Sequence, residues 1–233
     1  MSTRVSVRAA AARQNLRLWL MMVLTFVTGL LDAVGYLGLD RIFTGNMTGN
    51  IVILGMGLAG ADDLPVVGPL AALGAYVVGA AVAGRLLRRH RSEWVPIVTA
   101  IFTVNAGVLT AVATILATCQ IAATSAAGIA IAASVAALMG AQAASARALA
   151  VAEMTTVVVT STITAYASET LFTPGVAWLT HRRLWAIVVI FSGALAGALM
   201  MKLHICIPVY LAAVLTAAVA FLGHLAWETR LRG

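Results

Sequence analysis

Residues 94–146 read WVPIVTAIFTVNAGVLTAVATILATCQIAATSAAGIAIAASVAALMGAQAASA and contain no Asp, Glu, Lys or Arg. A water-soluble domain in a chain of 233 residues cannot bury so long an uncharged stretch. A bilayer, in contrast, takes about 20 mainly apolar residues in each helix that crosses it. The composition agrees, because 62% of the residues are hydrophobic, 10% are charged and the mean hydropathy is +1.00. We therefore predict an all-α polytopic membrane protein whose helices contact the lipid bilayer.

Six stretches are long and apolar enough to span the membrane. They are Leu18–Leu37, Val66–Gly84, Trp94–Thr118, Ile121–Ala144, Leu184–Met201 and Ile205–Trp227. Two further stretches, Thr44–Ala59 and Thr155–Ser168, are shorter and rich in Thr, Gly or Asn. We expect these two to be re-entrant or broken segments.

The placement of arginine favours this arrangement over eight full spans. If both short stretches crossed the membrane, the basic cluster from Arg85 to Arg91 would lie outside, against the excess of Lys and Arg in cytoplasmic loops. With six spans, this cluster and the basic residues of both chain ends lie inside. We therefore predict that both termini are cytoplasmic. Eight spans remain the alternative, because Thr155–Ser168 is nearly long enough to cross.

The two halves of the chain share a weak internal repeat. Thr44–Thr48 matches Thr156–Thr160 at an offset of 112 residues, and Pro96 matches Pro208 at the same offset. Three spans in each half would give the halves opposite orientations, as in transporters built from inverted repeats. The predicted organisation is a basic N-terminal tail (1–17), membrane half one (18–118), membrane half two (119–227) and a C-terminal tail (228–233).

Asp32 is the most unusual single residue, since it lies in the last third of the first predicted span. A carboxylate at the centre of a span costs on the order of 2.5–3.5 kcal/mol on insertion scales, so a compensating interaction is expected. Asp32 is a candidate proton, cation or solute site, or a support for the polar segment that follows. The alternative is a hydrated carboxylate near the membrane surface, beside Arg41.

The segment TGNMTGN, residues 44–50, is the richest polar cluster in the chain. Its glycines let the backbone leave helical geometry, and its Thr and Asn side chains can bond the backbone groups that a bend exposes. A helix that begins near Thr48 would point N–H groups into the protein, which suits an anion or a polar solute. Thr44, Asn46, Thr48 and Asn50 are therefore candidate binding residues. The alternative is a simple helix cap that binds no ligand.

The matching arm of the second half offers hydroxyl groups, with Thr160 and Thr162 as candidates, but no Asn or Gly. Threonines in membrane helices most often bond their own preceding carbonyls or a neighbouring helix, so this arm is the weaker site. Gln142 precedes the second arm as Asp32 precedes the first, so Gln142 can face Asp32 near a pseudo-twofold axis.

Other patterns argue against several functions. The formal charge of +7 comes from residues at helix ends, so we predict no nucleic-acid partner. Four scattered His and two Cys have no metal-ligand spacing, and no catalytic Ser/His/Asp or Cys/His arrangement is visible. We predict no enzyme activity, no metal and no other cofactor. Gly193 and Gly197 form a GxxxG pair that suits packing against a neighbouring helix or a second copy of the chain.

The sequence resembles the YoaK-like family of bacterial membrane proteins, a domain of unknown function. The residues that carry the resemblance are Gly29, Asp32 and Ala33, the TGNMTGN segment, Gly140, Ala141 and Gln142, and then Thr160, Ser161 and Thr162. The family tends to show Asn after the Gln and Gly within the second Thr motif, where this chain has Ala143 and Ser161. The resemblance covers nearly the whole chain. It implies a bacterial inner-membrane protein of about six spans, and it brings no established substrate.

On these grounds we expect a small secondary transporter or channel-like permease for an unidentified small solute or ion. Its candidate site consists of Asp32, Thr44, Asn46, Thr48, Asn50, Gln142, Thr160 and Thr162. The alternative is a non-transporting membrane scaffold or regulatory partner, in which the polar turns only stabilise broken helices.

Overall fold

The computed structural model describes residues 2–90, 94–149, 163–164, 166–170 and 182–231. Every regular element in these ranges is helical. The elements are α1 (Ser2–Gly38), α2 (Met47–Leu58), α3 (Val67–Leu87), α4 (Pro96–Thr118), α5 (Ala126–Ala148), a π-helical turn (Tyr166–Thr170), α7 (Arg182–Met201) and α8 (Cys206–Leu231). The predicted all-α class is confirmed.

Six of the described helices are long and apolar enough to cross a bilayer. Their apolar parts are Asn15–Gly38, Val67–Leu87, Pro96–Thr118, Ala126–Ala148, Leu184–Met201 and Cys206–Glu228. Helix α2 has 12 residues, a rise of about 18 Å, which is too short for a hydrocarbon core of about 30 Å. Thr44–Ala59 therefore contains a half-length helix, whereas most of Thr155–Ser168 lies outside the described residues.

Local caps decide where the helices begin. The Ser125 hydroxyl oxygen accepts a hydrogen bond from the N–H of Gly128 (3.1 Å), so α5 begins at Ala126 and not at the predicted Ile121. Pro96 occupies the first turn of α4, where its missing N–H would have no helical partner. The predicted tail before Leu18 is helical as well, because α1 extends back to Ser2.

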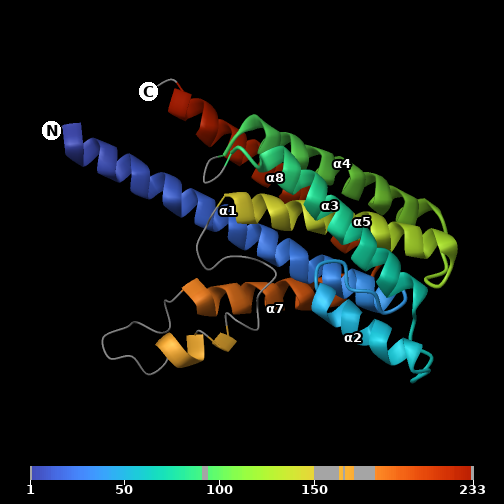
Figure 1. Ribbon diagram of the computed structural model, residues 1–233. Coiled ribbons are helices and arrows are strands. Elements are labelled where there is room, and N and C mark those ends of the chain that lie inside the picture. The colour runs from blue at the N-terminus through green and yellow to red at the C-terminus, as the bar shows by residue number, and fades with distance from the viewer. Residues whose placement is uncertain (1, 91–93, 150–162, 165, 171–181, 232–233) are drawn as a thin grey trace.

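The long helices alternate in direction (Figure 1). Helices α1, α4 and α7 run away from the end of the bundle at which both termini lie, and α3, α5 and α8 run back toward it. Helix α5, the first of the second half, is therefore antiparallel to α1. Opposite orientation of the two halves is what a three-plus-three inverted repeat requires.

The helix pairs follow the same repeat. The most extensive contacts join α3 with α5, α1 with α7, and α4 with α8. At the predicted offset α1 corresponds to α5, α3 to α7 and α4 to α8. The α3–α5 pair is therefore the repeat equivalent of the α1–α7 pair, and the α4–α8 pair is its own equivalent. This pattern of contacts supports the predicted internal repeat.

Glycines allow the closest of these contacts. A side chain at Gly29 of α1 would strike the backbone of α7, and one at Gly193 of α7 would strike the backbone of α1. Gly79 of α3 and Gly140 of α5 face each other's helix in the same way. Small residues at such positions let membrane helices approach closely enough for extensive packing.

The GxxxG face of α7 is used within the chain. A Cβ atom at Gly197 would lie 2.8 Å from the Leu30 carbonyl oxygen, and Gly193 lies against the same helix, α1. Of the two predicted partners for Gly193 and Gly197, a neighbouring helix or a second copy of the chain, the structure shows the first, because α1 occupies this face.

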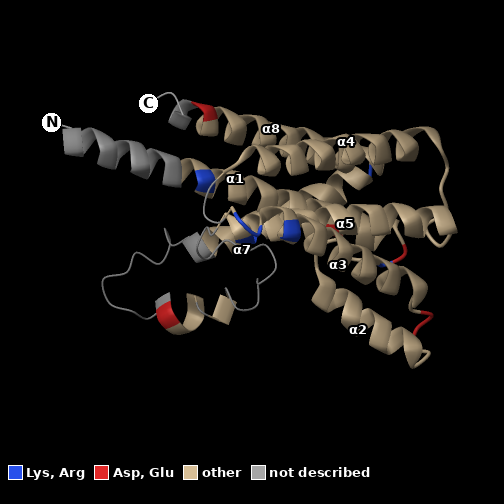
Figure 2. Cartoon of the chain, turned by 45° about the horizontal axis from the view of Figure 1, so that its top comes forward, with Lys and Arg blue, Asp and Glu red and all other residues tan. Residues whose placement is uncertain are grey.

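Charged side chains gather at the ends of the spans and in the connections, and the helices between them are largely uncharged (Figure 2). Within the described ranges Asp32 is the exception, since it lies six residues before the end of α1. Asp32 is therefore a carboxylate inside a span, and its interactions need an explanation.

Candidate functional site: a re-entrant turn on Asp32

The chain reverses direction directly after α1. Asp40 and Arg41 adopt left-handed backbone angles, with φ of 59° and 57°, and the N–H of Ile42 donates back to the Gly35 carbonyl (3.3 Å). Glycine is needed at position 35, because a Cβ atom there would strike the Ile42 backbone. Residues 42–46 consequently run back along α1 toward Asp32.

Helix α2 then returns to the end of the bundle from which the chain entered. It runs from Met47 to Leu58, and the carbonyl of Asp62 beyond it accepts a hydrogen bond from the Arg41 guanidinium (3.5 Å). The two ends of the excursion thus lie together, beside the end of α1 (Figure 1). The first of the two predicted re-entrant segments has the expected form.

Asp32 binds the turn at residues 44–46, where the re-entrant segment reaches farthest into the bundle. Its Oδ1 accepts hydrogen bonds from the backbone N–H groups of Thr44 (3.0 Å), Gly45 (2.6 Å) and Asn46 (3.3 Å). The Thr44 hydroxyl donates to the same oxygen (3.3 Å). Donors to an ionised group make stronger hydrogen bonds than donors to a neutral one, and they supply the compensation that a carboxylate inside a span requires.

Two asparagines stabilise the turn itself. The Asn46 side chain caps α2 by accepting a hydrogen bond from the N–H of Gly49 (3.2 Å). Asn50 pairs with the backbone of Phe43, since its Oδ1 accepts from the N–H (2.8 Å) and its Nδ2 donates to the carbonyl (2.6 Å). Both side chains therefore satisfy backbone groups that the bend leaves without helical partners.

Gln142 of α5 reaches α1 one helical turn before Asp32. Its Nε2 donates to the Leu24 carbonyl (3.3 Å) and to the Thr28 hydroxyl oxygen (3.1 Å). An amide oxygen cannot donate to a carbonyl, so the Leu24 contact fixes the orientation of the amide. The other amide atom, Oε1, is buried and has no hydrogen-bond partner among the described residues, and Gln142 as a whole is 1% exposed.

Thr28 links Gln142 to the turn, although the sequence did not single it out. Its hydroxyl donates to the Leu24 carbonyl (2.9 Å) and accepts from Gln142. Its methyl group would lie 2.8 Å from a Cβ atom at Gly45, so it lies directly below the turn. Its spacing of four residues from Asp32 on one helix face is the signal that points to it.

The structure places the predicted site residues unequally. Asp32, Thr44, Asn46 and Asn50 come together in the turn, whereas Gln142 contacts Thr28 and not Asp32, contrary to the predicted facing pair. Thr48 is exposed and forms no side-chain hydrogen bond within the described ranges, so it is not part of the cluster. Thr160 and Thr162 lie outside the described residues.

The N-terminal end of α2, where we predicted that an anion binds, is already occupied by the Asp32 carboxylate. The N–H groups that converge before α2 all point to the Asp32 carboxylate, and this charge also faces the positive end of the helix dipole. A dissolved anion would have to displace Asp32. The expectation that the turn suits an anion is therefore corrected by the structure.

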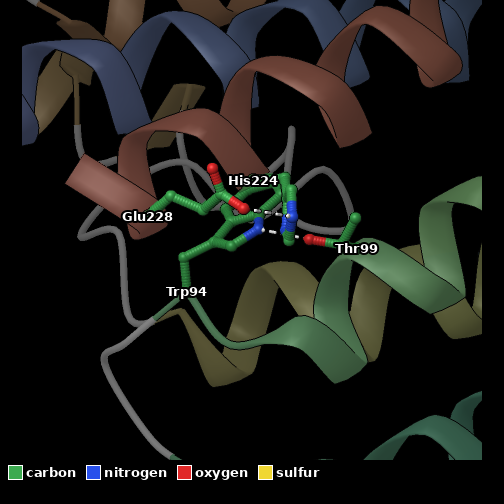
Figure 3. A network of polar contacts seen from close by, with 4 residues as sticks. All are labelled: Trp94, Thr99, His224 and Glu228. Atoms are coloured by element: carbon green, nitrogen blue, oxygen red, sulfur yellow. Dashed lines mark hydrogen bonds and ion pairs between the residues drawn. The ribbon is translucent and has the colours of Figure 1, made fainter. Parts of the chain in front are cut away.

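Two further polar contacts, one at the start of α4 and one within α8, lie close together at the end of the bundle where the termini lie (Figure 3). Trp94 Nε1 donates to the Thr99 hydroxyl (2.9 Å), and His224 Nε2 lies 3.4 Å from Glu228 Oε1. The Trp94 ring lies against Gly223, where a Cβ atom would strike it. We assign Trp94 a packing role, because its aromatic ring fills the space between the start of α4 and α8.

Comparison with known proteins places the chain in a family. Residues 20–222, which include the turn, Asp32 and Gln142, match the family model described as a protein of unknown function (DUF1275). The UPF0700 transmembrane protein YoaK of Bacillus subtilis (strain 168) is 34% identical over 101 residues, which cover 43% of this chain and 44% of that protein. The similarity to this relative thus spans less than half of either chain. No solved structure matches the chain. The predicted resemblance is confirmed, and the chain belongs to the DUF1275 family of membrane proteins of unknown function.

Proposed function

We propose that this protein is a small secondary transporter or channel-like permease for a small solute. The observation that supports the proposal is the half-length helix α2, whose preceding turn rests on Asp32 inside the bundle. Transporters built from inverted repeats bind substrates at broken helices near the membrane midplane, between the repeats. In this protein a broken helix, a membrane-embedded carboxylate and a contact between the two halves occur together.

The polar groups at this point come from both halves. Asp32, Thr28 and the turn belong to the first half, and Gln142 belongs to α5 of the second. All four hydrogen bonds to Asp32 reach Oδ1, so Oδ2 receives none from the described residues. An intramembrane carboxylate with an open oxygen is a candidate proton or ion site.

We also propose that the protein lies in the bacterial inner membrane with both termini cytoplasmic. Arg85 lies in the last turn of α3 and Arg88 directly follows this helix, at the end of the bundle where the termini lie, and basic residues are enriched on the cytoplasmic side. The bacterial source of the YoaK relative is in keeping with this compartment. We propose no enzyme activity.

Flux through purified protein in liposomes tests the transport proposal. A panel of small cations, anions and neutral solutes is offered to protein-containing and empty liposomes. We expect at least one solute to enter faster with protein, and we expect Asp32→Asn to abolish the difference. Asn keeps an oxygen for the three N–H groups of the turn, so the variant should fold while it lacks the charge.

Asp63→Asn is the matched control, because Asp63 is exposed in the connection between α2 and α3. This variant should transport as the unmodified chain does. Transport that is absent for every solute in folded protein, or that is unchanged in Asp32→Asn, contradicts the proposal.

A membrane scaffold or regulatory partner is the second candidate function. One observation favours it: Asn46 and Asn50 satisfy backbone groups within the turn, so this part of the segment is stable without a ligand. For a scaffold, Asp32→Asn should lower thermal stability and change nothing else. In addition, the unmodified chain should copurify with a defined membrane partner at a fixed stoichiometry.

A further inference from the structure

The backbone donors that face Asp32 and the amide nitrogen of Gln142 are already engaged. The N–H groups of Thr44, Gly45 and Asn46 bond Oδ1, and the Gln142 amide nitrogen bonds Leu24 and Thr28. A solute that needs donors from these groups can obtain them only if an internal hydrogen bond breaks. Such a loss costs about 1–3 kcal/mol for each buried group that is left unsatisfied.

Two acceptors near the same place are open. Asp32 Oδ2 accepts no hydrogen bond within the described part of the chain, since the four donors all reach Oδ1. Gln142 Oε1 is buried and also lacks a partner there. Gln142 bonds Thr28, four residues before Asp32 on α1, which is a rise of about 6 Å. Asp32, Thr28 and Gln142 thus form a polar seam between α1 and α5, within one helical turn along α1.

Within the described part of the chain, no basic side chain balances the charge at this seam. Among the described residues no ion pair joins Asp32 to Lys, Arg or His, and the basic residues lie at the ends of the spans. A carboxylate inside a membrane is typically paired or serves an ion pathway. Open acceptors together with an unbalanced negative charge suit a cation and disfavour an anion.

The second half adds no carboxylate at the corresponding position. Gly29 and Gly140 make equivalent contacts in the two helix pairs, and three residues later the chain has Asp32 in α1 and Ala143 in α5. The seam thus carries a single charge within the described helices. One charge matches a monovalent cation better than a divalent one.

We propose that the Asp32 and Gln142 seam binds a small monovalent cation, either an ammonium group or an alkali ion, between Asp32 Oδ2 and Gln142 Oε1. This inference rests on the proposed function and names the chemical class of what that site takes. Such a cation balances the carboxylate and supplies the buried amide oxygen with a donor or an ion.

Equilibrium binding to purified protein in nanodiscs tests the inference without any flux. The probe is radiolabelled methylammonium, and ammonium, sodium, potassium and choline are the competitors at constant chloride. We expect saturable binding that ammonium displaces and that the bulky choline does not. Displacement by sodium or potassium at lower concentration than ammonium assigns the site to alkali ions and keeps the inference.

The variants should change binding in opposite directions. Asp32→Asn and Gln142→Leu should each weaken methylammonium binding at least tenfold, whereas Gln142→Glu, which adds a second acidic oxygen, should strengthen it. Asn105→Leu is the matched control for loss of a buried amide, because Asn105 bonds the Leu138 carbonyl and neither Asp32 nor Gln142, so this variant should leave binding unchanged. If Gln142→Leu does not fold, Asp32→Asn and Gln142→Glu carry the test.

Two results overturn the inference. No saturable binding of methylammonium, sodium or potassium to folded protein removes the cation site. Binding of labelled acetate or chloride that depends on Asp32 shows that the turn takes anions. Solute flux in the liposome assay would leave the transport proposal standing in both cases, so the two proposals fail independently.

Discussion

Two helix pairs, α1 with α7 and α3 with α5, share one packing scheme and differ in polarity. Each pair closes on glycines that face the partner's backbone: Gly29 and Gly193 in the first, Gly79 and Gly140 in the second. The first pair carries Asp32 and supports the re-entrant turn, whereas the equivalent position of the second is Ala143. Helix packing repeats because it needs only small residues at close contacts. The chemistry does not repeat, because it depends on one side chain.

The largest expected effect tests whether the two pairs are packed equally. Gly29→Leu and Gly140→Leu should each destabilise the protein by roughly 3 kcal/mol or more, the upper end for overpacking, because the new side chain meets backbone that cannot rotate away. Thermal unfolding and the yield of monodisperse protein measure the loss.

Gly74→Leu is the control for these glycines, since nothing lies within 4 Å of a Cβ atom there. It should fold normally. If only one of the two variants, Gly29→Leu or Gly140→Leu, is destabilised, then only one of the two helix pairs is close-packed.

Adding the missing carboxylate to the second half tests the chemical difference. We expect Ala143→Asp to lower stability by on the order of 2–3 kcal/mol, the cost of an acidic side chain inside a span. The matching sequence Thr156–Thr160 contains no glycine to bring N–H groups together as Gly45 does. Thermal unfolding of Ala143→Asp beside Ala143→Ser, a neutral polar control, measures the cost. A neutral effect would mean that the second half also compensates a charge.

The turn is expected to depend on Asn50 and not on Thr48. Asn50→Leu removes both partners of the Phe43 backbone and should cost about 2 kcal/mol, within the range for buried groups left unsatisfied. Thr48→Val changes an exposed side chain and should stay within about 0.5 kcal/mol. If Asn50→Leu and Thr48→Val change the thermal unfolding equally, Asn50 does not stabilise the turn.

The smallest expected effect concerns the contact between the halves. Thr28→Val keeps the shape of the side chain and removes the hydroxyl that accepts from Gln142 (3.1 Å). We expect a loss of about 1 kcal/mol, typical of one hydrogen bond, because Gln142 retains its bond to Leu24. Thr25→Val is the control, since among the described residues Thr25 bonds only the Met21 carbonyl of its own helix. A loss no larger than that of the control would show that the contact contributes nothing.

Much of this fold could be predicted from the sequence, because apolar run length alone identifies membrane spans. All six predicted spans overlap the described ones, and Thr44–Ala59 was recognisably too short to cross. The glycines and asparagines of residues 44–50 indicated a bend, since few other residues satisfy a broken helix.

The site was only partly predictable, because the spacing of residues along the sequence does not reveal contacts between different helices. Asp32 and the turn are close in sequence, and their association could be expected. The contact of Gln142 with Thr28 joins residues 114 positions apart, and a rough repeat does not fix which helical turn faces which. The order of Asp32 and Gln142 before their polar arms pointed to Asp32, one turn away from the residue that Gln142 actually contacts. The glycines of α7 left two partners open, a neighbouring helix or a second copy, because a GxxxG pair does not say whether its partner helix belongs to the same chain.

Sided labelling of single cysteines tests the re-entrant turn most directly. Arg41→Cys and Ala61→Cys, which bracket the excursion, are made in a chain with Cys119→Ser and Cys206→Ala, and Arg88→Cys marks the opposite end of α3. A membrane-impermeant maleimide is added to intact cells, before and after permeabilisation. The account predicts that positions 41 and 61 react in intact cells and position 88 reacts only after permeabilisation. Reaction of positions 41 and 61 from opposite sides would mean that the segment crosses the membrane, and it would contradict the turn on Asp32.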